Sequence, residues 1–164
     1  MKELFVGFEL AKLLCDVGFD EPCMANYYRK ADVSGNILNG SSLWSVLSDP
    51  KQYHRFKYNS IYSINWDNKK WYVHYSAPTY EQVQNWLRDK CGYYIMIYPE
   101  FNGWTYNIKK NDNGLYIPLE IEIKWKSNSY YSVLFEVIKQ LLYIIIEESN
   151  KNINKYNKLK EMMI

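Results

Sequence analysis

Apolar side chains recur every three or four residues near both ends of the chain, which predicts an amphipathic helix in each place. The first helix is expected from about Glu3 to Val17, followed by Gly18 in the left-handed conformation that closes a helix. The other is expected from about Ser129 to Glu148, with six residues facing inward: Leu134, Val137, Ile138, Leu141, Leu142 and Ile145. The polar stretch 149–164 after it is expected to be a flexible tail.

A third helix is expected in the middle of the chain. Thr79 and Gln82 form the sequence pattern of a capping box, in which each residue bonds to the backbone N–H of the other. Gly92 stands where this helix would end. The helix is therefore predicted from about residue 80 to residue 91.

Runs rich in aromatic and β-branched residues predict strands between these helices. The runs lie at residues 24–29, 61–66, 71–75, 93–98, 104–108 and 119–126. The last run alternates strictly between apolar and charged residues, as a strand with one buried and one solvated face requires. Residues 32–50 are rich in Gly, Ser, Asn and Asp, and we expect a long loop with little regular structure there.

Short turns between the predicted strands favour antiparallel pairing. The expected fold class is therefore α+β, with a mostly antiparallel twisted sheet of about five to six strands and three helices packed mainly on one face. Neither an internal repeat nor an interdomain linker interrupts the chain, so we expect a single domain over residues 1–148.

Composition narrows the class of protein. The 164 residues are 48% hydrophobic, which excludes a wholly disordered chain, and their net charge of +2 disfavours a dedicated nucleic-acid binder. Almost all basic residues are lysines, so sequence-specific readout of nucleic acid is not expected. No apolar run is long enough to cross a membrane. An odd number of cysteines and no signal-peptide pattern are typical of a cytoplasmic protein with reduced thiols.

Most motifs that carry chemistry are missing from the sequence. It contains neither of the glycine-rich phosphate-binding motifs, and neither His54 nor His74 has a cysteine or carboxylate at zinc-ligand spacing. Cys15 and Cys91 are expected at helix C-termini, where the helix dipole disfavours a thiolate, and Cys23 is expected near a strand. We therefore expect no metal, no cofactor and no cysteine catalysis.

One enzymatic hypothesis remains open. Glu122 and Lys124, preceded by Asp112, have the residue types of a PD-(D/E)xK nuclease, in which carboxylates hold Mg²⁺ and the lysine steadies the attacking water. About ten extended residues separate Asp112 from Glu122, a span of roughly 33 Å, so only a sharp break near Pro118 would bring the carboxylates together. Alternating charges on a solvated strand face explain the same residues without a site.

Aromatic residues are the second signal, because many of them fall on predicted strands. One face of a sheet must be core, and aromatic residues left on the other face would form a platform for bases, nucleotides or a partner protein. The candidates for such a binding surface are Tyr72, Tyr94, Tyr98, Trp104 and Tyr106. Packing in the core is the alternative role for each of them.

Two segments carry a family resemblance. Residues Phe8 to Leu14 followed by Gly18 to Cys23 resemble the opening of a family of small uncharacterised proteins from Bacteroidetes, their mobile elements and gut phages, including crAss-like phages. Ser76 to Val83 with Trp86 to Arg88 is similar to the same family's middle helix, and Gly103 to Tyr106 to the strand after it. The resemblance implies a source and a small accessory role. It implies no chemistry.

These observations together favour a non-enzymatic phage or mobile-element accessory protein that acts by protein–protein interaction. Exposed tyrosine and tryptophan are what interfaces select, so we expect a host or phage protein as partner, together with possible homo-oligomers. The first alternative is a protein that binds or sequesters a nucleotide-like small molecule. The second alternative is the metal-dependent nuclease.

Overall fold

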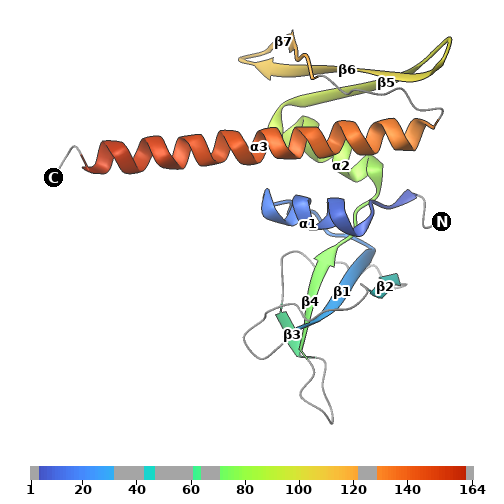
Figure 1. The fold of residues 1–164 in the computed structure, drawn as a ribbon, viewed down its shortest axis with the longest axis vertical. Helices are drawn as coiled ribbons and strands as arrows, with labels where there is room; N and C mark the ends of the chain where they lie inside the picture. The colour runs from blue at the N-terminus through green and yellow to red at the C-terminus, as the bar shows by residue number, and fades with distance from the viewer. Residues whose placement is uncertain (1–3, 32–42, 47–60, 64–70, 122–128, 162–164) are drawn as a thin grey trace.

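Helices and strands alternate along the chain in the computed structural model, which describes residues 4–31, 43–46, 61–63, 71–121 and 129–161 (Figure 1). The helices of this part of the chain are α1 (Phe8–Asp16), α2 (Tyr80–Cys91) and α3 (Tyr130–Glu161). Its strands are β1 (Ala25–Ala31), β2 (Leu43–Val46), β3 (Ile61–Ser63), β4 (Trp71–Ser76), β5 (Tyr93–Glu100), β6 (Gly103–Asp112) and β7 (Leu115–Pro118). The α+β class predicted from the sequence is confirmed.

The strands form two separate sheets, so the expectation of a single sheet is wrong. One sheet has the order β2-β1-β4-β3 and the other β5-β6-β7, and every described pair is antiparallel. The break falls at α2, which carries the chain from β4 in the first sheet to β5 in the second. Figure 1 shows the helices between the two sheets, with α1 at one end of β1 and β4, so the helices pack against both sheets instead of on one face of a common sheet.

The ends of α1 follow from local hydrogen bonds. Its last turn closes as a Schellman motif: the Gly18 N–H donates to the Cys15 carbonyl at 3.1 Å and the Phe19 N–H to the Leu14 carbonyl at 2.9 Å. Its start was expected near Glu3 but lies at Phe8. Phe5 and Val6 do not join the helix, because Val6 donates its N–H to the Pro78 carbonyl and Phe5 forms a bridge with Thr79.

The capping box of α2 is present as predicted. The Thr79 hydroxyl accepts from the Gln82 N–H at 3.1 Å, and the Gln82 side chain accepts from the Thr79 N–H at 2.9 Å. The amide of Gln82 also donates to the Pro22 carbonyl at 3.1 Å, which ties the helix to the segment after α1. Gly92 ends the helix at φ +75°, a conformation that glycine adopts without strain.

Two strand predictions need correction. Part of the expected loop 32–50 is the strand β2, which pairs with β1. The strand expected at 119–126 does not begin at Leu119, and a strand that was not expected, β7, lies before it. The turn at Asn113 and Gly114, both at positive φ, reverses the chain at once and lets β7 pair with β6. Residues 119–121 are not in a strand, and residues 122–126 lie outside the described residues.

Helix α3 is longer than the sequence pattern indicates. It continues past the expected end at Glu148 to Glu161, and its 32 residues correspond to about 48 Å of helix. Figure 1 shows its C-terminal half projecting away from both sheets. The residues expected to form a tail are therefore helical as far as Glu161.

The core fills the space between the two sheets, with the helices at its centre. All six residues predicted to face inward from α3 pack there; Ile145 is partly buried and the other five are fully buried. Aromatic rings join the layers: Phe8 of α1 packs edge-on against Tyr27 and Tyr75 of the first sheet, with ring centroids 5.7 and 5.4 Å apart. On the other side, Trp104 of β6 meets Tyr130 of α3 at 5.3 Å.

The capping box makes a testable contribution to stability. Replacing Thr79 with Ala removes the acceptor for the Gln82 N–H and is expected to lower the free energy of unfolding by about 1 kcal/mol. Urea denaturation followed by circular dichroism measures the change. Thr79→Ser keeps the hydroxyl and is expected to stay within a few tenths of a kcal/mol of the wild type; an equal loss in both variants would show that the cap contributes nothing.

Candidate functional site

The register of the three-stranded sheet assigns its side chains to two faces. Ile95 lies opposite Ile108 and Ile97 opposite Tyr106, and these residues face the helices. Tyr93 and Ile108 on this face are fully buried. Because successive residues of a strand point to opposite faces, Tyr94, Met96 and Tyr98 must lie on the outer face.

The outer face carries a group of exposed tyrosines. Tyr94, Tyr98 and Tyr116 are 40%, 42% and 54% exposed. Tyr94 and Tyr116 meet edge to face across β6, with ring centroids 6.1 Å apart. We call Tyr94, Met96, Tyr98 and Tyr116 the tyrosine face. Tyr94, Met96 and Tyr98 stand on β5, whose other face packs on the core through Tyr93, Ile95 and Ile97, so their backbone positions are fixed before any partner arrives.

One end of the tyrosine face is bordered by charge. Arg88 of α2 donates to the Asp89 carboxylate at 2.8 Å, and this bond raises the pKa of Arg88 and lowers the pKa of Asp89. Tyr94 and Tyr116 are within electrostatic range of Arg88 and contribute weakly to its raised pKa. Arginine beside tyrosine is a common pairing at protein interfaces.

Further apolar side chains are exposed around the same sheet. Phe101 stands fully exposed at the tip of the turn between β5 and β6, and Leu115 and Ile117 of β7 are also exposed. The sequence analysis did not select these residues or Tyr116. The signal for them was the run from Leu115 to Pro118 directly after the Asn-Gly turn, which is typical of the second strand of a hairpin.

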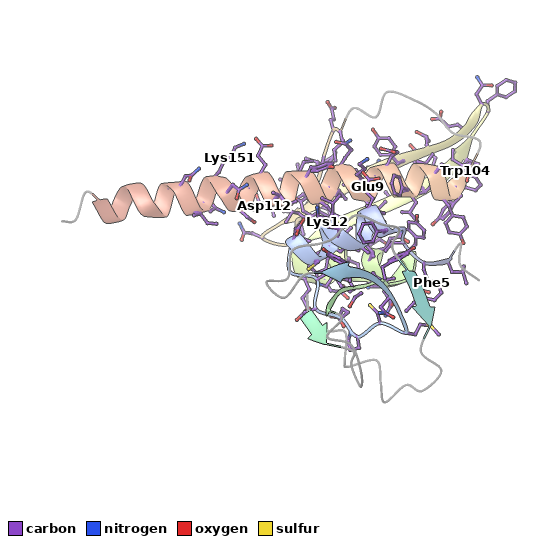
Figure 2. The ribbon with its side chains drawn as sticks, turned by 60° about the horizontal axis from the view of Figure 1, so that its bottom comes forward. Phe5, Glu9, Lys12, Trp104, Asp112 and Lys151 are labelled. Atoms are coloured by element: carbon purple, nitrogen blue, oxygen red, sulfur yellow. The ribbon has the colours of Figure 1, made fainter. Side chains whose placement is uncertain are left out.

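The predicted aromatic candidates do not share one surface. Tyr94 and Tyr98 are exposed on the outer face, whereas Trp104 and Tyr106 are half-buried on the helix-facing side. The Tyr106 hydroxyl donates to the Ile121 carbonyl, and Figure 2 shows Trp104 beside the first turns of α3. Tyr72 pairs through its backbone with Tyr62, and its side chain lies outside the described part of the structure.

A cavity of about 460 Å³ lies where β6 extends beyond β7. Its size is in the range of small-molecule sites. Among its described lining residues the charged one is Glu120, and the full lining is Trp104, Thr105, Tyr106, Asn107, Ile108, Pro118, Leu119, Glu120, Ile121 and Val133. Phosphate groups are bound by cationic side chains, and no lysine or arginine is among the described lining residues, so this part of the structure adds no support to the nucleotide-like alternative.

The nuclease residues are not brought together in the described part of the chain. Asp112 is exposed at the end of β6, while Glu122 and Lys124 lie outside the described residues. Among the residues that the structure describes, no group of three His, Cys, Asp or Glu could hold a metal ion. The nuclease hypothesis stays a prediction without structural support.

Cys23 and Cys91 are poor nucleophiles in this structure. Burial raises the pKa of the Cys23 thiol to about 12, and the nearby Glu21 carboxylate adds to the shift. Burial also raises the pKa of Cys91 to about 11. Because the thiolate is the reactive form, these two side chains act as small apolar residues at neutral pH.

An ion pair joins α3 to the β5-β6-β7 sheet at the point where the helix begins to project beyond the sheet. Lys110 of β6 forms an ion pair with Glu148 at 2.7 Å, and the Tyr93 hydroxyl donates to the same carboxylate at 3.4 Å. Lys110 also lies 5.1 Å from the centre of the Tyr93 ring. The pKa of Lys110 is raised because its ammonium group donates a hydrogen bond to the Glu148 carboxylate. The contact marks the end of the packed part of α3.

Comparison with known proteins adds no assignment: no family model, curated protein or solved structure matches the chain. Within the described segments, no helix has the length and apolar character to cross a membrane. The function has to be argued from the sites themselves.

The raised pKa of Cys23 is open to a direct test. At pH 8.5 the folded protein should hold on the order of 1000-fold less Cys23 thiolate than an ordinary cysteine, because its pKa stands about three units higher. We therefore expect iodoacetamide to modify Cys23 at least about 100-fold more slowly in the native protein than in urea, as measured by peptide mass spectrometry. Equal rates in the two states would contradict the buried, neutral thiol.

Proposed function

We propose that the chain is a non-enzymatic binding protein that acts by protein–protein interaction, with the tyrosine face as its contact surface. The observation that carries the proposal is where exposed apolar side chains gather. Of the ten large apolar residues exposed in the described part of the chain, Tyr94, Tyr98 and Tyr116 lie together on the tyrosine face, and Phe101 lies at the turn between β5 and β6. Two more, Leu115 and Ile117, lie on the other face of the same sheet, opposite Asp112 and Lys110. Exposed apolar side chains that gather on one surface are typical of an interaction site, whereas single exposed apolar residues are common on any protein surface.

The chemistry of the tyrosine face suits a protein partner. A tyrosine buries a large apolar area while losing little conformational freedom, and its hydroxyl can bond at the rim of an interface. Met96 adds an adaptable side chain between Tyr94 and Tyr98 on the same strand. Arg88 at the border supplies a planar donor of the kind enriched in binding hot spots.

The setting of this interaction is proposed from the sequence alone. The resemblance to proteins of Bacteroidetes and their phages favours a host or phage protein as partner, in the cytoplasm of the bacterial cell. This part of the proposal is independent of the tyrosine face, because a partner from another source would use the same exposed rings.

The proposal predicts a specific effect of one substitution. Tyr98→Glu places a carboxylate in a contact that should be desolvated, and we expect it to reduce capture of the partner by at least about tenfold. Affinity-tagged protein is incubated with an extract of the source cell, and bound proteins are quantified by mass spectrometry against wild type.

Tyr143→Glu is the matched control, because Tyr143 on α3 is 44% exposed, much as Tyr98 is at 42%, but lies away from the tyrosine face. This variant should retain the wild-type set of bound proteins. Equal capture by Tyr98→Glu and Tyr143→Glu, or no protein captured above the tag alone, would overturn the proposed function.

A further inference from the structure

The end of α3 projects beyond the body: near its base Glu148 forms the ion pair with Lys110, and from there the helix extends outward. We call residues 147–161 the arm. The buried residues of α3 end at Leu142, and every side chain described from Glu147 to Lys155 is exposed. Figure 2 shows Lys151 on the part of the helix that extends beyond the body. A helix of about fifteen residues is only marginally stable in water without packing, so the arm is a segment that would gain from a partner.

The arm continues the helix with a seam at coiled-coil spacing. Starting from the buried Leu142, the positions Ile146, Ser149, Ile153 and Tyr156 follow at intervals of four, three, four and three residues. This alternation is the a/d pattern by which two helices pack along each other. Ile153, in the middle of the seam, is 56% exposed. Along the arm, the seam has nothing packed on it among the described residues.

The residues beside the seam indicate what can cover it. In the heptad set by Ile146 and Ile153, the flanking positions carry the uncharged residues Asn150, Asn152, Asn157 and Leu159. The charged residues among the described side chains of the arm, Glu147, Glu148, Lys151 and Lys155, fall instead on the outer positions of this heptad. Two identical arms can therefore pack together without repulsion between like charges at the positions beside the seam. Self-association of a helix requires that such repulsion is absent.

The seam also favours one orientation. In a parallel, in-register pair, Lys160 would face its own copy at a core position. In an antiparallel pair, Lys160 can face Ser149, Ile153 can face Tyr156, and the two bodies stand at opposite ends of the pair. We propose that two copies of this chain associate through their arms as an antiparallel pair of helices. This interface is separate from the tyrosine face and does not rest on the proposed function.

Sedimentation analysis over a range of concentrations tests the association. We expect the wild type to pass from one to two copies of the 19.7 kDa chain as concentration rises. Ile153→Lys puts a charge in the seam and should weaken the dimer at least about tenfold. Asn154→Lys adds the same charge at the adjacent residue on the outer side and should change the dissociation constant less than about twofold. Circular dichroism confirms that both variants are folded.

Disulfide formation tests the orientation. Cysteines at positions 149 and 160 of one chain are about 16 Å apart along the helix, too far to be bridged, and in an antiparallel pair each faces the other position of the second copy. Ser149→Cys mixed with Lys160→Cys should therefore oxidise to a mixed dimer, whereas each variant alone should not. The wild type controls for its native cysteines.

Three results would overturn the proposal. The first is a wild type that stays monomeric at every concentration, and the second is a dimer that Ile153→Lys and Asn154→Lys affect equally. The third is rapid disulfide formation by either single variant alone, which would show a parallel pair. Dimers of Tyr98→Glu are expected to form as in the wild type, so failure of the arm and failure of the tyrosine face are separate outcomes.

Discussion

The packing of one helix layer against two small sheets is the constraint on which the rest of the structure depends. Among the described residues the two sheets do not pack on each other, and the helices between them supply the apolar surface that each sheet buries. Helix α1 contacts β4 of the first sheet and also α3, while α3 contacts β5 and β6 of the second. The buried run Leu134, Val137, Ile138, Leu141 and Leu142 therefore stands at the junction of both halves. This arrangement decides which tyrosines become core and which remain outside.

The same constraint explains why the sheet has two different faces. Once α3 covers the side with Tyr93 and Ile108, the alternation of the strands leaves Tyr94 and Tyr98 on the opposite side. The tyrosines on that side are held by the buried neighbours that alternate with them. Binding would then require little reordering of the backbone, which reduces the entropy lost when a partner docks.

Local features of the fold could be predicted from the sequence, because they depend on residues close together in the chain. The capping box at Thr79, the left-handed glycines at Gly18 and Gly92, and the inward residues of α3 all follow from spacing within a few turns. The division into two sheets could not be predicted, since it depends on β1 pairing with β2 and β4 across long stretches of chain. For the same reason the sequence predicted both Trp104 and Tyr94 as candidates for the binding surface. Only the position of α3 shows that they lie on opposite faces of the sheet.

The central claim is that the outer face of the β5-β6-β7 sheet is a protein contact. Hydroxyl-radical footprinting of the chain inside its own cells, compared with the purified chain, tests this most directly. The account predicts that Tyr94, Tyr98 and Tyr116 react readily in the purified protein and are protected in cells, while the exposed Tyr143 reacts alike in both. Equal reactivity of the three tyrosines in both samples, or protection of Tyr143 instead, would contradict it.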